Sequence, residues 1–275
     1  MKTKHIIKLS RIIYFFLKFF YKKNQIHTRD KIKWCLDLNE GIDLSIFLFG
    51  TSEKKIQNLK KIFKLNQKLT IIDIGANIGS ISIPLAKTFN KSKIYSIEPT
   101  HYAFKKLIKN LKLNSDLKKN ISINQLFISK MNKPKKVWSS WNFDDDRKKH
   151  KQHLGTLNPI KKKSYMSLIK FIKLKKIKKI DFIKLDVDGH ELDVLKSGEK
   201  FLKAKKPVIF IEIAPYLYPE FGYECSVLTS YIKKLGYEFY SDDLKKIKNI
   251  NNYVKKITYG GSKNFYLMKS KNAKY

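Results

Sequence analysis

Short apolar runs rich in isoleucine recur along this chain, and segments with apolar residues at helical spacing lie between them. Continuous apolar runs are typical of strands buried on both faces of a sheet. Phe104, Leu107 and Leu111, in contrast, follow the period of a helix. The pattern predicts strands at 70–75, 93–98, 121–128, 180–187, 207–213, 237–240 and 264–268, and helices at 81–88, 101–113, 192–202 and 226–235. Strands that alternate with helices favour a mostly parallel sheet with helices on both faces.

Two regions depart from this alternation. Residues 28–68 form a lead-in, in which the pattern predicts a strand at 44–49 and a helix at 52–63. Residues 138–163 are polar and contain several aspartates and two histidines, which we interpret as a solvated loop rather than a metal site. A long loop at the carboxyl edge of such a sheet often forms a lid or a substrate wall.

The first 25 residues combine lysines with an apolar run, 12–21, that Lys18 interrupts. This run is shorter than the ~20 residues that span a bilayer, and no cleavage site of a signal peptide follows it. Two interpretations stay open: a helix at the membrane interface, or a helix packed on the protein or on a second subunit. We expect a basic, apolar N-terminal helix with the lead-in at 1–67 and an α/β catalytic domain at 68–275. We expect a cytoplasmic protein, and peripheral binding at the inner face of the membrane stays open.

The net charge of +36 raises the question of a nucleic-acid partner. Arg11, Arg29 and Arg147 are the arginines, and the rest of the 59 basic residues are lysines spread along the chain. Because readers of bases and phosphates favour the planar fork of arginine, we interpret the charge as a solvated surface and expect no nucleic-acid partner. Cys35 and Cys225 provide no disulfide framework, which favours a reducing compartment.

The segment TIIDIGANIG at 70–79 joins a predicted strand to a helix through a glycine turn. Strand, glycine turn and helix form the edge of a nucleotide site in doubly wound sheets, with an acid for the ribose about 20 residues further on; Glu98 occupies that place. The glycines follow G-x-x-x-G rather than the dinucleotide spacing, and an aspartate before the turn suits a cation better than a phosphate. We therefore expect S-adenosylmethionine as cofactor, with contacts from Asp73, Gly75, Asn77, Gly79, Glu98 and Asp186.

A second group of functional residues follows the strand predicted at 180–187, in the segment KLDVDGHEL. Ligands of open α/β sheets bind beyond the carboxyl ends of the strands, at the point where the strand order reverses. Asp186, Asp188 and His190 should therefore lie beside the reactive end of the cofactor. The alternative is an ordinary acidic turn in which an aspartate caps the next helix.

Four segments together resemble the FkbM-type S-adenosylmethionine-dependent methyltransferases. These segments are IDIGANIGS at 72–80, IEP at 97–99, IKLDVDG at 183–189 and VIFIEI at 208–213. The resemblance covers about residues 68–215. It implies the class I methyltransferase (Rossmann-like) fold, an α/β sheet of seven mostly parallel strands, and methylation of a hydroxyl oxygen, often on a sugar or polyketide. The chain departs from the family pattern at Ile169 and Lys130, where acids are common.

We therefore expect an O-methyltransferase that acts on a small-molecule, carbohydrate or lipid-linked glycan acceptor. His190 or Asp188 is the expected catalytic base, with His190 first because an imidazole titrates near neutrality; a surface role for His190 stays open. We assign no metal, although Asp186, Asp188 and Glu212 leave a metal-dependent variant open. An RNA methyltransferase, and a non-catalytic membrane- or nucleic-acid-associated protein that kept the fold, are the alternatives.

Overall fold

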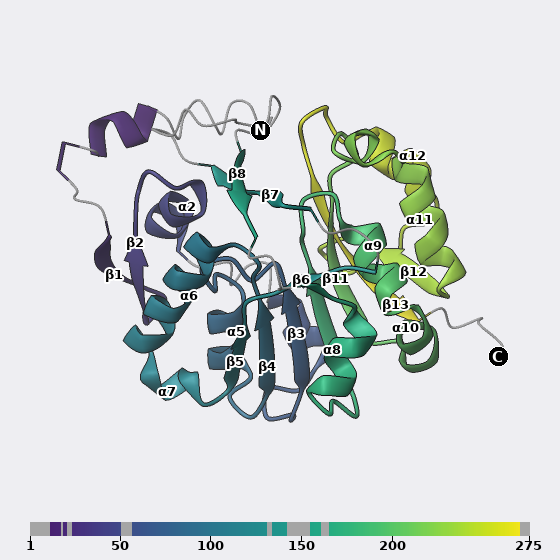
Figure 1. Cartoon of the computed structure of the whole chain (residues 1–275), viewed down its shortest axis with the longest axis horizontal. Coiled ribbons are helices and arrows are strands. Elements are labelled where there is room, and N and C mark those ends of the chain that lie inside the picture. The colour runs from purple at the N-terminus through teal and green to yellow at the C-terminus, as the bar shows by residue number, and fades with distance from the viewer. Residues whose placement is uncertain are drawn as a thin grey trace.

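A seven-stranded sheet forms the centre of the computed structural model, which describes residues 12–17, 19–20, 24–50, 57–130, 134–141, 155–160 and 165–269 (Figure 1). Its strand order is β12-β13-β11-β10-β3-β4-β5. The strands are β3 (Thr70–Ile74), β4 (Lys93–Ile97), β5 (Ile121–Asn124), β10 (Phe182–Leu185), β11 (Val208–Ile213), β12 (Tyr237–Tyr240) and β13 (Lys263–Lys269). Only β13 pairs antiparallel with its neighbours, β11 and β12. The expected class I methyltransferase fold is confirmed.

Helices cover both faces of the sheet, because alternate strand residues are apolar on each face. Ile72 and Ile74 belong to one hydrophobic cluster and Ile71 to the other. The first cluster packs α8 (Leu168–Leu174), α9 (Glu191–Ser197), α10 (Glu199–Lys205), α11 (Cys225–Lys234) and α12 (Ile250–Lys255). The second packs α5 (Ser82–Thr88), α6 (His101–Leu113), α7 (Ser115–Lys118) and the lead-in. The order of strands reverses between β3 and β10, which is where such sheets bind ligands.

The lead-in contains a helix where a strand was expected at 44–49. Helix α2 (Gly41–Phe49) buries Leu44 and Ile46 and ends at Gly50, which has a φ of 79°. A short apolar run fits a buried strand and a buried helix equally well, so its periodicity did not separate them. Of the helix expected at 52–63, residues 52–56 lie outside the described part and α4 (Leu59–Ile62) is helical.

Two further differences concern the limits of elements. The strand expected at 121–128 is divided, because β6 (Phe127–Ile128) pairs with β9 (Tyr165–Met166) instead of with the main sheet. The polar segment 138–163 is partly a hairpin of β7 (Lys136–Trp141) and β8 (Gly155–Pro159). Its aspartates and histidines lie outside the described residues.

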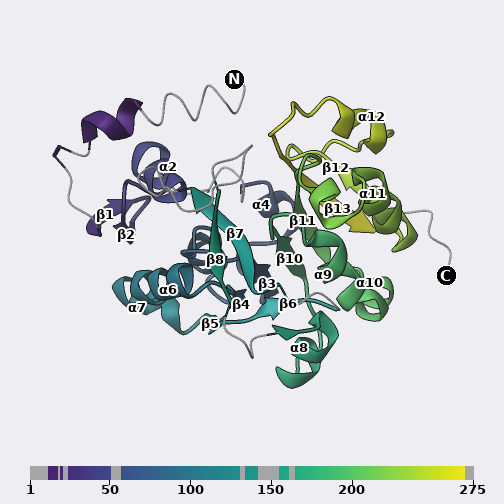
Figure 2. The same ribbon diagram turned by 45° about the horizontal axis from the view of Figure 1, so that its top comes forward.

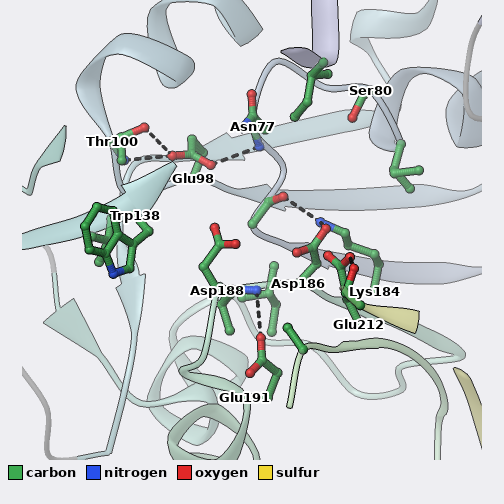
Figure 3. A pocket seen from close by; sticks show the side chains of 18 of the residues that line it. Asn77, Ser80, Glu98, Thr100, Trp138, Lys184, Asp186, Asp188, Glu191 and Glu212 are labelled. Atoms are coloured by element: carbon green, nitrogen blue, oxygen red, sulfur yellow. Dashed lines mark hydrogen bonds and ion pairs between the residues drawn. The ribbon is translucent and has the colours of Figure 1, made fainter. Parts of the chain in front are cut away.

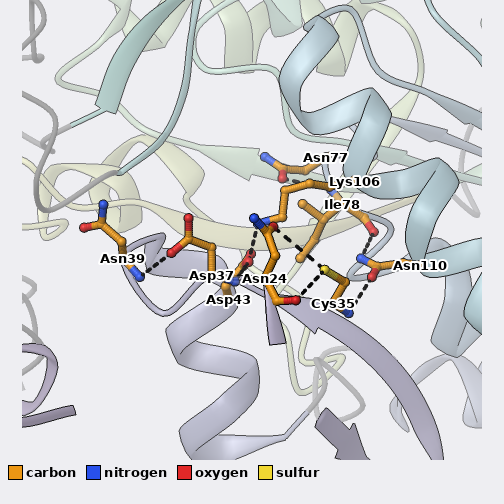
Figure 4. A network of polar contacts seen from close by, with 9 residues as sticks. All are labelled: Asn24, Cys35, Asp37, Asn39, Asp43, Asn77, Ile78, Lys106 and Asn110. Carbon is orange, nitrogen blue, oxygen red and sulfur yellow. Dashed lines mark hydrogen bonds and ion pairs between the residues drawn. The ribbon is translucent and has the colours of Figure 1, made fainter. Parts of the chain in front are cut away.

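Polar contacts attach the lead-in to the rest of the fold (Figure 4). The hairpin of β1 (Gln25–Arg29) and β2 (Ile32–Leu36) lies against α6. The side chain of Asn110 accepts the Cys35 N–H at 2.8 Å and donates to the Ile78 carbonyl at 3.0 Å. Buried Lys106 of α6 forms an ion pair with buried Asp43 of α2. The side chain of Asn110 therefore links β2 of the lead-in to Ile78, in the turn that follows β3.

Candidate active site

A cavity of about 550 Å³ lies at the carboxyl ends of β3, β4 and β10 (Figure 3). This volume is within the ~300–1,000 Å³ that is typical of small-molecule sites. The floor consists of two segments: residues 75–79, which we call the glycine turn, and residues 186–190, which we call the β10 loop. Both segments follow strands that meet where the strand order reverses, so the chain topology alone brings them together.

The two glycines of the glycine turn have different roles. Gly75 has a φ of 81°, and a Cβ there would lie 1.8 Å from the carbonyl oxygen of Asp186, so the two loops meet only because no side chain intervenes. Gly79 also has a left-handed φ, of 91°, but its added Cβ would meet Leu107 of α6 at 2.8 Å. Gly79 is not among the residues that line the cavity. It permits close packing of the turn on α6.

Glu98, at the end of β4, faces the cavity with a carboxylate that is already hydrogen-bonded. Its Oε2 accepts the Asn77 N–H at 2.9 Å, and its Oε1 accepts the Thr100 N–H at 2.9 Å and the Thr100 hydroxyl at 2.5 Å. Burial raises the pKa of Glu98, and the three donors act in the opposite direction. Asn77 holds a φ of 49° in this contact. The carboxylate is thus fixed before any ligand arrives.

Lys184 was missed as a functional residue by the sequence analysis, because a lysine inside an apolar strand gives no signal of its own. Its ammonium donates to the Gly75 carbonyl at 2.6 Å and lies 3.3 Å from Asp186 and 3.6 Å from Asp73. Asp73 is fully buried, accepts from the Ser82 hydroxyl at 2.6 Å, and does not line the cavity. Lys184 therefore links the glycine turn to the β10 loop through its contacts with Gly75 and Asp186.

The β10 loop carries Asp186 and Asp188 into the cavity. Asp188 has a left-handed φ of 48°, and Figure 3 shows its carboxylate pointing into the open space. Burial, followed by the charges of Asp186 and Glu191, raises the pKa of Asp188 well above its ordinary value. Glu191, the first residue of α9, accepts the N–H groups of Val187 and Gly189, at 3.2 and 3.3 Å. Glu191 thereby holds the loop that positions Asp188.

His190 lies apart from these groups. It is buried and is not among the residues that line the cavity. Its ring contacts those of Phe127 and Phe221, with centroids 5.0 and 4.5 Å away, and its Nδ1 has no hydrogen-bond partner among the described residues. Burial lowers the pKa of His190 to about 4. The structure thus places Asp188 in the lining of the cavity and His190 outside that lining.

Segments far apart in the sequence line the cavity, and Figure 2 shows α2 and β7, two of the elements that contribute to it. Helix α2 contributes Ser45 and Phe49, β7 contributes Trp138, and the segment after β11 contributes Tyr216. The hairpin strand β7 was expected as a loop, yet it forms a wall as the sequence analysis proposed for that segment. Among the described residues, no three His, Cys, Asp or Glu side chains are arranged to hold a metal ion.

The family follows from a comparison with known protein families. A family model described as the methyltransferase FkbM domain matches residues 73–239, which include both floor segments of the cavity. The chain belongs to the FkbM methyltransferase family. This membership agrees with the methyltransferase fold and with the S-adenosylmethionine cofactor that the sequence motifs predict.

Individual relatives of this FkbM-family chain are distant. An FkbM methyltransferase from Methylobacillus flagellatus KT is 16% identical, with a TM-score of 0.48 over 81% of this chain and 47% of that chain. M. jannaschii TYW2, in complex with AdoMet, is 18% identical, with a TM-score of 0.43 over 90% of this chain and 85% of that chain. A Pyrococcus horikoshii tRNA(Phe) (4-demethylwyosine(37)-C(7)) aminocarboxypropyltransferase is 30% identical over 89 residues. These cover 32% of this chain and 29% of that protein, so the chain spans less than a third of this curated relative.

The cavity fits the cofactor of the FkbM family in charge and in shape. The described residues that line it include one cation, Lys184, and five carboxylates, namely Glu98, Asp186, Asp188, Glu191 and Glu212. A ligand with a sulfonium and an ammonium group is complementary to this lining. Gly75 lines the cavity, and its lack of a side chain lets the glycine turn meet the Asp186 carbonyl at the edge of this space.

Proposed function

We propose that this protein transfers a methyl group to a hydroxyl oxygen of a carbohydrate or lipid-linked glycan. The observation that carries the proposal is the contrast between the chain and its cavity. The whole chain has a net charge of +36, whereas the described residues with ionisable side chains that line the cavity include five carboxyl groups and one lysine. A neutral, hydroxyl-rich acceptor can accept and donate hydrogen bonds there, while a phosphate would be repelled. Trp138 and Tyr216 add flat apolar surfaces with polar edges.

The cofactor residues in this proposal are Glu98 and residues of the glycine turn and the β10 loop. S-adenosylmethionine, when bound, supplies an electrophilic methyl group on a sulfonium leaving group. Glu98 accepts hydrogen bonds from the ribose hydroxyls, Gly75 and Asn77 give backbone close to the nucleoside, and Asp186 faces the cationic end. Asp73 and Gly79 act indirectly: Asp73 is paired with Lys184 under the floor and Gly79 packs the turn on α6. Because these groups are fixed in advance, positioning alone can contribute ~7–11 kcal/mol to catalysis.

Asp188 is the base in this mechanism. It lines the cavity, and its raised pKa makes its carboxylate a stronger proton acceptor than an exposed aspartate. The acceptor hydroxyl donates its proton to Asp188 as the new oxygen–carbon bond forms. General-base assistance of this kind contributes roughly 10²–10⁴-fold to a rate. His190 stands outside the cavity, so we assign it to packing between Phe127 and Phe221.

An RNA acceptor is the second candidate function. Two observations favour it: the net charge of +36, and the similarity over 89 residues to a protein whose name specifies tRNA(Phe). In this case the lysines of the surface would bind the phosphates while a base entered the cavity. Such binding would weaken steeply with salt, because each neutralised phosphate releases counterions.

A methyl-transfer assay separates the two candidates. The protein is incubated with S-adenosylmethionine labelled in the methyl group, and with either a panel of simple glycosides and lipid-linked sugars or unmodified tRNA. We expect label in a sugar methyl ether, and loss of that product in Asp188→Asn. Label in tRNA, with no sugar product, would overturn the glycan proposal in favour of the RNA candidate.

A further inference from the structure

Five large apolar side chains project from the N-terminal helix at residues 12–17 and the turn after it. Ile12, Phe15, Phe16, Phe19 and Phe20 are 56%, 53%, 62%, 69% and 81% exposed. They are five of the twelve exposed large hydrophobic residues in the described part of the chain, gathered within nine positions. Single exposed apolar residues are ordinary on protein surfaces, whereas a contiguous patch marks an interaction site.

The spacing of these residues is that of one side of a helix, and the structure describes residues 12–17 as helical and residues 19–20 as a turn. Positions 12, 15, 16, 19 and 20 follow the i, i+3, i+4, i+7, i+8 series of an amphipathic helix. Tyr14 and Leu17, from the other side, pack against the cluster that contains α2 and the lead-in. The helix is therefore attached to the protein by one face and presents the aromatic face outward. We call the five exposed side chains the aromatic face.

The charge around the aromatic face identifies its partner. The sequence has no acidic residue before Asp30, and lysines precede, interrupt and follow the segment 12–20 along the chain, at Lys2, Lys4, Lys8, Lys18, Lys22 and Lys23. A second copy of a chain with a net charge of +36 would meet this region with repulsion. Nucleic acid would match the charge but would leave the aromatic rings in water. An anionic bilayer satisfies both features, because it offers acidic headgroups above a hydrocarbon layer.

We propose that the aromatic face is a membrane-docking surface, which lies flat in the headgroup layer of an anionic bilayer. No described helix has the length and apolar character needed to cross a membrane. The helix lies beside α2 in both views of the molecule, at the end where β7 and β8 also lie (Figures 1 and 2). Because α2 lines the cavity, docking would place the cavity near the lipid surface. That last consequence rests on the proposed function and suits a lipid-linked acceptor.

Co-sedimentation of the full chain with vesicles tests the proposal. The vesicles are an equal mixture of phosphatidylcholine and phosphatidylglycerol, or phosphatidylcholine alone. We expect the protein to bind the anionic vesicles more tightly. The joint change of Phe15, Phe16, Phe19 and Phe20 to Ser should weaken this binding by about 100-fold or more, since each ring that leaves the interface forfeits its burial.

A matched control changes exposed apolar residues elsewhere. Leu65→Ser with Leu174→Ser removes two side chains that are 53% and 63% exposed, and it should leave vesicle binding unaltered. Calorimetric binding of S-adenosylmethionine by every variant verifies the fold and keeps this test separate from the proposed activity. Wild-type vesicle binding that survives the four serine changes would overturn the proposal. So would absent vesicle binding together with a dimer that the four changes dissociate, because the face would then bind a second copy.

Discussion

Glu98 and Asp188 are two carboxyl groups that face the same cavity, and burial raises the pKa of both, but the fold holds them differently. Glu98 is held by three hydrogen-bond donors from Asn77 and Thr100. Asp188 stands on a left-handed turn, where burial and the charges of Asp186 and Glu191 raise its pKa. A group that binds a ligand gains from being fixed and satisfied, whereas a group that takes a proton gains from an environment that disfavours its charge. Glu98 thus belongs to the part of the site that binds the cofactor, which we call the binding side. Asp188 belongs to the part that takes the proton, which we call the chemical side.

Asp188→Asn should have the largest effect, because it removes the base without changing the shape of the side chain. We expect a loss of roughly 10²–10⁴-fold in kcat, with the affinity for S-adenosylmethionine unchanged. The wild-type rate should rise with pH through the raised pKa of Asp188, since only the ionised carboxylate accepts a proton. Single-turnover kinetics measure this, with exposed Asp116→Asn as the control. Equal turnover in wild type and Asp188→Asn would remove Asp188 from the chemical side.

Gly75→Ala should disturb both sides of the site at once. The new methyl group would overlap the carbonyl oxygen of Asp186 and push the glycine turn away from the β10 loop. We expect a stability loss about 1–3 kcal/mol greater than that of the control, together with weaker cofactor binding. The control is Gly222→Ala, where φ is 77° but nothing lies within 4 Å of the added atom. Thermal unfolding compares them, and equal losses would show that backbone strain, not the collision, decides the effect.

His190→Phe should have the smallest effect on turnover and a specific effect on stability. The folded state lowers the pKa of His190 from 6.5 to about 4, so it favours the neutral imidazole. Stability is therefore complete above pH 6.5 and is lost as the pH falls toward 4, by up to about 3 kcal/mol. The phenylalanine variant should lack this loss. Unfolding from pH 7 to pH 4.5 measures the difference between the two proteins. A variant that keeps its fold and cofactor affinity but loses turnover would restore His190 as the base.

The sequence predicted the main sheet and the loops that follow its strands at the cavity, but not every regular element. The seven strands, the position of Glu98 and the loop with Asp186 and Asp188 follow from periodicity and from the rule that ligands bind where the strand order reverses. Helix α2 was mistaken for a strand because its apolar run is too short to show a period. The orientation of His190 could not be deduced either, because Phe127 and Phe221, which enclose it, are distant in the sequence.

The sequence analysis predicted a wall from the segment that begins at Trp138, but not which residues of other regions meet it there. Trp138, Phe49 and Tyr216 come from three separate regions, and their meeting depends on tertiary packing. Lys184 looked like an irregularity in a buried strand, and only the structure shows its ammonium between Asp73, Asp186 and the Gly75 carbonyl. Local patterns thus determine which residues can act, whereas long-range contacts determine which of them face the ligand.

Calorimetric titration with S-adenosylmethionine, comparing wild type with Glu98→Gln, addresses the binding side most directly. The glutamine keeps the size of the side chain, but its amide would turn an N–H toward the donors of Asn77 or Thr100. We expect one cofactor per wild-type chain and an affinity about 10- to 100-fold lower in the variant, as for the loss of a charge-assisted contact, with the fold retained. A folded variant with wild-type affinity would contradict the assignment of Glu98 to the cofactor.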